Sequence, residues 1–219
     1  MRSILVMNAK GGCGKTTLAT NLAGYYATQG KSVLLADFDP QASSLDWLAE
    51  RPETSPEIQG IAAYEEKFRA NKNTDILIMD APAGLHGKEL SNLMRRTETL
   101  IMPILPSPLD IRAASRFIEI LKKINKVERS EIRLATVANR VRENTLAGND
   151  LFGYLSKQKL PDGKKFPFMN TLRASQNYIR AAEKGLSIFE FAPAATEVDR
   201  EQWKPLLRWL NSVRSQPKK

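Results

Sequence analysis

The chain has 219 residues, of which 42% are hydrophobic and 26% are charged, and its formal net charge is +9. This length suits one well-buried domain, so we expect a single domain over residues 1–219. No stretch has the roughly 18 uncharged apolar residues of a membrane span, the N-terminus resembles no signal peptide, and a single cysteine, Cys13, with a single histidine, His86, excludes disulfide and zinc scaffolds. We expect a soluble, cytoplasmic protein.

Short apolar runs that are rich in Ile, Val or Leu alternate with segments of helical period. The expected strands are Ile4–Met7, Val33–Ala36, Ile76–Met79, Leu100–Leu105, Ile132–Ala138 and Ile188–Phe191. The expected helices are Thr16–Gln29, Glu57–Ala70, Lys88–Arg95, Ile111–Asn125 with Asp110 as its N-cap, Leu146–Lys157, Arg173–Lys184 and Glu201–Val213. The alternation predicts an α/β fold, with a twisted, mostly parallel sheet that carries helices on both faces.

A glycine-rich loop follows the first expected strand and runs directly into a helix. Its sequence is Ala9-Lys10-Gly11-Gly12-Cys13-Gly14-Lys15-Thr16-Thr17. The glycines let consecutive backbone N–H groups turn towards phosphate oxygens, and the helix N-terminus adds its positive dipole. We therefore expect a P-loop NTPase in which the nucleotide is bound by Gly11, Gly12, Cys13, Gly14, Lys15, Thr16 and Thr17. Lys15 provides the cation for the β and γ phosphates, and Thr16 provides a hydroxyl for Mg²⁺.

The start of this loop departs from the ordinary phosphate-binding motif, because Ala9 stands where that motif has glycine and a second lysine, Lys10, precedes Gly11 and Gly12. This arrangement resembles the ParA/MinD family of deviant Walker ATPases. The resemblance implies that the nucleotide is ATP, that two subunits form a homodimer with ATP sandwiched at the interface, and that the chain hydrolyses ATP. It also implies that Lys10 reaches the phosphates held by the other subunit, so Lys10 and Lys15 are both candidate catalytic residues.

Three carboxylates follow expected strands, at the sheet edge where α/β proteins bind their ligands. Asp37 and Asp39 are two residues apart, so their side chains are expected to point the same way, towards Mg²⁺ and the γ-phosphate; alternatively, this Asp-x-Asp before a proline starts a turn. The family resemblance implies that Asp39 orients the attacking water, that Asp37 assists at the metal and that Asp80 holds Mg²⁺. It also implies a switch loop over Pro82–Gly87.

Asn139 follows the strand expected at Ile132–Ala138. The resemblance implies a contact between Asn139 and the adenine edge. A strand-end asparagine that satisfies a turn is the alternative.

The net charge is unevenly distributed, since residues 1–110 carry 11 Lys/Arg against 13 Asp/Glu and residues 111–219 carry 22 against 11. Such asymmetry favours a polyanionic partner, although a basic surface that serves only solubility is an alternative. A helix over Arg173–Lys184 would place Arg173, Asn177, Arg180 and Lys184 in one stripe. By resemblance, we expect Arg173, Arg180 and Lys184 to bind DNA non-specifically, with Lys204 and Arg208 as further candidates.

The resemblance extends to small stand-alone members that position plasmids, carboxysomes or chemoreceptor clusters. It implies a nucleoid-associated protein, an adaptor protein that stimulates hydrolysis, and no stable association with a membrane. Two alternatives stay open. The apolar residues from Trp203 to Val213 could form a membrane-targeting helix as in the MinD branch, but docking of this helix on the sheet is preferred. A P-loop metabolic or metal-insertion ATPase is the other alternative.

Overall fold

A computed structural model describes residues 1–65, 68–129, 131–142, 145–160 and 162–217. Seven strands within these ranges form one sheet, in the order β3-β2-β4-β1-β5-β6-β7. They are β1 (Arg2–Val6), β2 (Val33–Asp37), β3 (Gln59–Ala62), β4 (Ile76–Asp80), β5 (Thr99–Ile104), β6 (Arg133–Val141) and β7 (Phe168–Arg173). All neighbouring pairs in this sheet are parallel.

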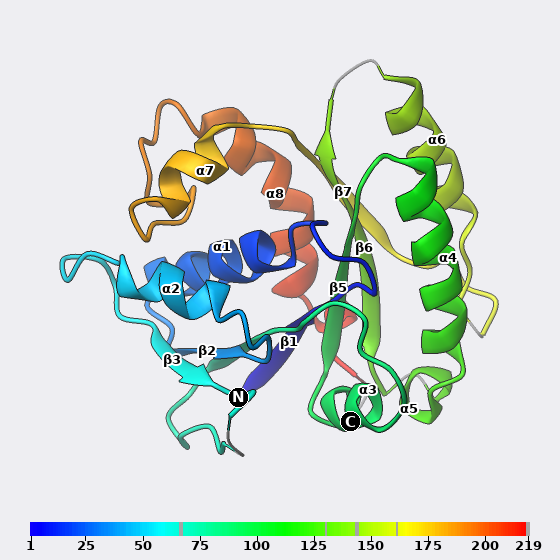
Figure 1. Cartoon of the computed structure of the whole chain (residues 1–219), viewed down its shortest axis with the longest axis horizontal. Helices are drawn as coiled ribbons and strands as arrows, with labels where there is room; N and C mark the ends of the chain where they lie inside the picture. Colours follow the sequence, from blue (N-terminus) through cyan, green and yellow to red (C-terminus); the bar gives the residue numbers. More distant parts are fainter. Residues whose placement is uncertain (66–67, 130, 143–144, 161, 218–219) are drawn as a thin grey trace.

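Helices cover both faces of the sheet (Figure 1). One face carries α1 (Lys15–Thr28), α2 (Ser43–Ala49), α7 (Asn177–Ala182) and α8 (Glu197–Leu210). The other face carries α3 (Gly87–Arg95), α4 (Pro108–Lys122), α5 (Asn125–Glu128) and α6 (Leu146–Lys157). A short 3-10 turn, Val213–Ser215, follows α8. The expected fold class is confirmed.

The protein has two hydrophobic cores, one on each face of the sheet, and successive side chains of a strand enter them in turn. In β1, Ile4 and Val6 face the core under α1 and α8, whereas Leu5 packs into the core under α4. All three are completely buried, because side chains alternate across a strand and this sheet is covered on both sides. The loops at the carboxyl ends of the central strands are therefore held by a packed and rigid layer.

The segment Ile188–Phe191, which was expected to be a strand, forms a turn, so this prediction was wrong. The backbone N–H groups of Glu190 and Phe191 both donate to the carbonyl of Ser187, at 3.0 and 2.9 Å. Glu190 Oε2 accepts bonds from the Ser187 N–H and hydroxyl, at 3.0 and 2.7 Å. These local bonds close the chain into a turn, from which Ile188 is completely buried and Phe189 and Phe191 are partly buried.

Two expected helices are also wrong. Within Glu57–Ala70 the chain forms β3, because Gly60 lets the backbone pass closely under α2; a Cβ at Gly60 would lie 2.6 Å from Leu48. Residues 66–67 of this prediction lie outside the described ranges. The segment Arg173–Lys184 is divided, since β7 ends at Arg173 and α7 begins only at Asn177.

The start of α4 differs from the prediction as well. Ser107, not Asp110, is the N-cap, and its hydroxyl accepts from the backbone N–H of Asp110 at 3.2 Å. Pro108 occupies the first helical position, which its fixed φ and missing N–H favour. Asp110 thus lies in the first helical turn and its carboxylate is available for another contact.

Candidate nucleotide-binding site

The glycine loop lies between β1 and α1 at the centre of the sheet, because β1 is flanked by β4 and β5. Gly12 and Gly14 have φ of 74° and 90°, a left-handed conformation that strains other residues. Gly14 is also the N-cap of α1 and has no side chain that could accept from the first helical N–H groups. These N–H groups are the donors that a phosphate group would satisfy.

The two lysines of the loop have different surroundings. Lys15 is the first residue of α1 and is only 8% exposed. The side chain of Lys10 is 38% exposed, and its Nζ lies 2.8 Å from Oδ2 of Asp110, a residue in the first turn of α4. Asp110 also accepts a 2.5 Å hydrogen bond from the Ser107 hydroxyl. Lys10 is therefore held outside its own phosphate loop, by a carboxylate one hundred residues away.

Asp80 ends β4 next to the loop and is 1% exposed. Its Oδ1 has no hydrogen-bond partner among the described residues. Burial is the main reason that the pKa of Asp80 is raised to about 7; the charges of Asp37 and Asp39 add to this effect, and the Thr16 hydroxyl and Lys15 act against it. A buried carboxylate oxygen without a donor, beside a threonine hydroxyl, fits a Mg²⁺ ion.

The described residues contain no group of three or more Asp, Glu, His or Cys side chains that could hold a metal alone. Mg²⁺ does not need such a group, because in phosphate sites it is held by one or two protein ligands together with phosphate oxygens and water.

Asp37 lies beside Asp80 in the sheet register and is fully buried. Its Oδ1 accepts the N–H of Asp39 at 2.9 Å, and its Oδ2 accepts the N–H and hydroxyl of Ser44, at 3.0 and 2.7 Å. Asp37 thus anchors the first turn of α2. Asp39 is half-buried and accepts the N–H of Gln41 at 3.0 Å, in a turn. The roles of Asp37 at a metal and of Asp39 in orienting water stay predictions.

The loop after β4, which was expected to act as a switch, contacts the phosphate loop directly. The N–H of Gly84 donates to the carbonyl of Ala9 at 3.0 Å.

Cys13 is completely buried, its Sγ lies 3.3 Å from the Lys10 carbonyl, and burial raises the pKa of its thiol. A buried neutral thiol at this position is typical of a residue that fills space in the loop.

Asn139 closes the other side of the phosphate loop. The pairing of β6 with β7 shifts register between Ala138 and Val141, and Arg140 has φ of 52°. Such bulges re-aim side chains beside functional sites. Here the Asn139 amide donates to the Cys13 carbonyl at 2.8 Å, and a Cβ on Gly14 would lie 2.3 Å from the amide nitrogen.

A cavity of about 660 Å³ opens beside Asn139. Thr17, Arg142 and Tyr178 are among its other lining residues. Its size is within the range of small-molecule sites. The cavity adjoins the loop where a base and ribose would continue from bound phosphates.

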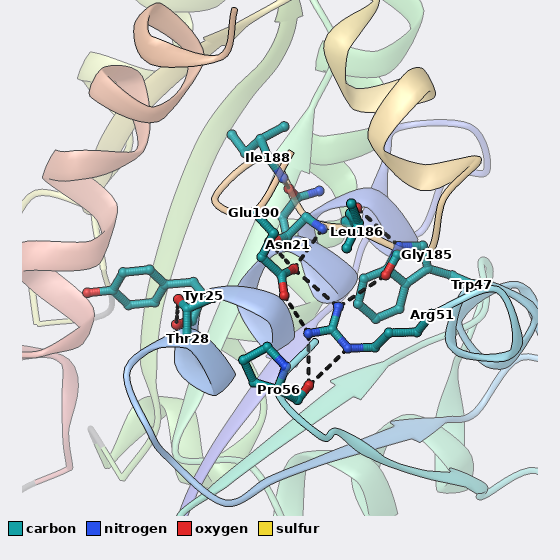
Figure 2. A network of polar contacts seen from close by, with 11 residues as sticks. Asn21, Tyr25, Thr28, Trp47, Arg51, Pro56, Gly185, Leu186, Ile188 and Glu190 are labelled. Carbon is teal, nitrogen blue, oxygen red and sulfur yellow. Dashed lines mark hydrogen bonds and ion pairs between the residues drawn. The ribbon is translucent and has the colours of Figure 1, made fainter. Parts of the chain in front are cut away.

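A buried ion pair that sequence reasoning missed links the site to the opposite end of α2. The guanidinium of Arg51 forms a two-pronged contact with Glu190, at 2.5 and 3.1 Å, and both side chains are less than 10% exposed (Figure 2). Arg51 also donates to the carbonyls of Pro56 and Gly185. The N–H of Ile188 donates to Asn21 of α1 at 2.9 Å. This network joins α1, α2 and the turn after α7.

The predicted DNA-binding residues do not form one helical stripe. Arg173 ends β7, and its Nε lies 2.6 Å from the completely buried Asp199 of α8. Arg180 is exposed on α7. Lys184 is exposed after α7, with its Nζ 5.6 Å from the ring centroid of Phe191. The stripe was wrong because the helix does not begin at Arg173.

The last helix docks on the sheet, as expected. Trp203, Leu206 and Leu210 of α8 are completely buried. Val213 is 82% exposed but lies beyond the helix. Within the described ranges, no helix is both long and apolar enough to cross a membrane.

Comparison with known proteins confirms the resemblance. The family model "CobQ/CobB/MinD/ParA nucleotide binding domain" matches residues 4–188. The chain is 26% identical over 209 residues to "Maintenance of carboxysome distribution protein A" of Halothiobacillus neapolitanus, covering 90% of this chain and 93% of that protein. It is 30% identical over 201 residues to the protein of the same name from Gloeobacter kilaueensis, covering 87% and 85%.

The fold is also shared with solved structures. A putative plasmid partition protein of Borrelia burgdorferi, bound to AMPPNP, superposes with a TM-score of 0.72 at 16% identity, covering 94% of this chain and 98% of that one. Because the family model spans most of its length, the chain belongs to the CobQ/CobB/MinD/ParA family of nucleotide-binding ATPases.

Proposed function

We propose that this chain is an ATP-dependent dimeric switch, which binds DNA non-specifically while ATP is bound and positions or segregates a cargo through partner-stimulated hydrolysis. The contrast between the two lysines carries this proposal. Lys15 is buried at the start of α1, where it can neutralise phosphates of its own subunit. Lys10 is directed out of the loop towards α4 and is more exposed, which suits a residue that acts on the nucleotide of a second subunit.

The expected chemistry depends on alignment more than on covalent steps, as in other phosphoryl transfers. Bound Mg²⁺ supplies charge neutralisation at the phosphate oxygens, and Thr16 and Asp80 are the residues that would hold it. Lys15 and the first N–H groups of α1 bind the phosphates. Lys10 of the partner subunit adds a second positive charge, and Asp39 orients the attacking water. Asn139 and the cavity beside it receive the adenine.

The matrix and the cargo are proposed from charge and from the relatives. The excess of Lys and Arg after residue 110 favours a polyanion such as DNA. Arg180 and Lys184 are the exposed candidates for phosphate contacts, whereas the Arg173 guanidinium is engaged by Asp199. Nearly full-length matches to carboxysome distribution proteins favour a large cytoplasmic body as cargo. The protein would then be cytoplasmic and nucleoid-associated, with an adaptor that stimulates hydrolysis.

The experiment that tests this function compares Lys10→Ala with Lys15→Ala. Lys15→Ala should abolish nucleotide binding, measured by calorimetry with AMPPNP and Mg²⁺. Lys10→Ala should keep most of that affinity but lose nucleotide-dependent dimerisation, measured by sedimentation. An equal loss of nucleotide affinity in both variants contradicts the proposed role of Lys10.

Binding to DNA is tested in the same preparation. Nucleotide-dependent retention on duplex DNA should fall, and its salt dependence should become shallower by about two charges, when Arg180 and Lys184 are both changed to glutamate. Lys157→Glu with Lys159→Glu, at exposed positions at the end of α6, is the matched control. Unchanged retention in the variant that carries Arg180→Glu and Lys184→Glu would refute the proposal that these two residues bind DNA.

A further inference from the structure

A hollow lies between α3 and the loops that follow β2, β3 and β4. It is on the face of the sheet opposite α1. Its volume is about 770 Å³, which is enough for one or two side chains of a bound segment. The apolar residues that line it are Phe38, Pro40, Ala63, Tyr64, Phe68, Pro82, Leu85 and Leu93. We call this hollow the α3 groove.

The rim of the α3 groove is positively charged. Arg95 and Arg96, at the end of α3, are exposed and line it, against one lining carboxylate, Glu89. A smaller hollow of about 490 Å³ adjoins it through Arg95 and adds the exposed Lys88. The groove therefore combines an apolar floor with an excess of cations at one end.

Two of the three aromatic rings that line the groove, those of Phe38 and Phe68, are already engaged with neighbours. Phe38 and Phe68 pack edge to face with ring centroids 6.0 Å apart. The guanidinium of Arg96 lies 5.2 Å from the centroid of the Phe68 ring, and its Nη1 donates to the Phe68 carbonyl at 3.3 Å. These rings do not offer the open stacking faces by which proteins bind single-stranded nucleic acid. An apolar pocket with cations beside it suits an acidic peptide better.

The walls of the groove are also parts of the candidate catalytic loops. Phe38 lies between Asp37 and Asp39, and its N–H donates to the Asp80 carbonyl at 2.9 Å. The N–H of Ala63 donates to the Asp37 carbonyl at 2.7 Å. A molecule in the groove would thus contact residues that are bonded to Asp37 and Asp80, together with Phe38 and Pro40, the two chain neighbours of Asp39.

We propose that the α3 groove is the docking site for an extended segment of a partner protein, in which an aromatic or aliphatic side chain is flanked by carboxylates. The apolar side chain fills the groove, and the carboxylates pair with Arg95 and Arg96. Docking at this groove does not depend on the proposed ATPase function.

The test uses a fluorescein-labelled, amidated hexapeptide with the order glutamate, glutamate, phenylalanine, leucine, glutamate, glutamate. Two matched peptides replace all four glutamates by lysine, or phenylalanine and leucine by serine. Fluorescence anisotropy with the whole chain should show saturable binding of the first peptide below about 1 mM and at least tenfold weaker binding of the other two. No saturation, or equal binding of the lysine peptide, overturns the proposal.

A protein variant locates the site. Arg95→Glu should weaken binding of the acidic peptide about tenfold. Lys157→Glu is the matched control, because Lys157 is likewise an exposed basic residue at the last position of its helix, α6. If both variants or neither weaken binding, the groove is not the site. The three peptides on the unchanged chain decide the question if Arg95→Glu fails to fold.

The two proposals fail separately. If the peptide binds but the chain has no ATPase activity, the proposed function is wrong and the docking site stands. If ATP is hydrolysed and the acidic peptide does not bind, the α3 groove is wrong and the function stands.

Discussion

The ion pair between Lys10 and Asp110 should restrain dimerisation, and Asp110→Asn should release it. The pair is short, with 2.8 Å between Nζ and Oδ2, but Lys10 is 38% exposed. Such a half-exposed pair contributes up to about 1 kcal/mol. Two pairs must open in a symmetric dimer, so the variant should gain up to about 2 kcal/mol, which corresponds to a dissociation constant of the dimer that is lower by up to roughly 30-fold.

Asparagine keeps the shape of the aspartate and its side-chain oxygen near Ser107. The assay is sedimentation velocity over a range of protein concentrations, with AMPPNP and Mg²⁺. Glu197→Gln is the control, because it removes an exposed acidic residue from the first turn of α8 and therefore has the same effect on a helix dipole. A dissociation constant that stays the same or rises in a folded Asp110→Asn protein refutes the reasoning.

Three further predictions concern the site and its supports. Burial raises the pKa of Asp80 from 3.8 to about 7, so the folded state holds this proton more tightly than the unfolded state, and the metal-free protein should lose stability as pH rises from about 4 to 7. Asp80→Asn should therefore raise the melting temperature without Mg²⁺ or nucleotide at pH 8 but not at pH 4; calorimetry that finds no such difference between the two pH values contradicts this. Arg51→Met leaves Glu190 buried without its ion-pair partner and should cost about 3 to 5 kcal/mol in urea unfolding, whereas Lys204→Met, in the exposed pair with Glu201, should cost less than about 1 kcal/mol; similar losses would mean that burial of the pair is unimportant. Gly14→Ala should abolish AMPPNP binding, because its Cβ would meet Asn139 at 2.3 Å, and Gly30→Ala should preserve it, because that position also has a positive φ but no atom within 4 Å of the added Cβ; retained binding in Gly14→Ala would show that Asn139 can move aside.

The parts of the fold that sequence predicts correctly are those with a strong local signal. β2, β4 and β5 are almost wholly apolar, and β1 and β6 contain shorter apolar stretches, because both faces of these central strands are buried. The glycine loop also has a strong local signal, because its glycines, lysines and flanking elements are adjacent in the chain. The family assignment followed from that loop.

The edges of the sheet have weaker signals. β3 is half-exposed and contains Gly60, and β7 alternates between buried and partly buried residues, so neither shows the apolar run of a central strand. Ile188–Phe191 has three apolar residues out of four, but it is closed into a turn by Glu190, which Arg51 holds from another part of the chain.

Some features of the site can likewise be predicted from neighbouring residues, whereas others depend on contacts between distant parts of the chain. The order of Lys10, Asp37, Asp39 and Asp80 along the chain indicates the chemistry. The pair between Lys10 and Asp110 depends on how α4 starts, and the contact of Asn139 with Cys13 depends on a bulge in β6. Interactions between residues one hundred or more positions apart need the folded chain before they can be identified.

The parallel order of the sheet also determines when the nucleotide site can form during synthesis. β1 has only later strands as neighbours, and its first residue, Arg2, pairs with Ile76 of β4. At roughly 5 to 20 residues per second, a ribosome needs about 4 to 15 s to make the chain between them. During that time Ile4, Leu5 and Val6 have no neighbouring strand with which to pair. The glycine loop becomes anchored on both sides only once β5 has also emerged, so ATP can stabilise the late stages of folding but not the early ones.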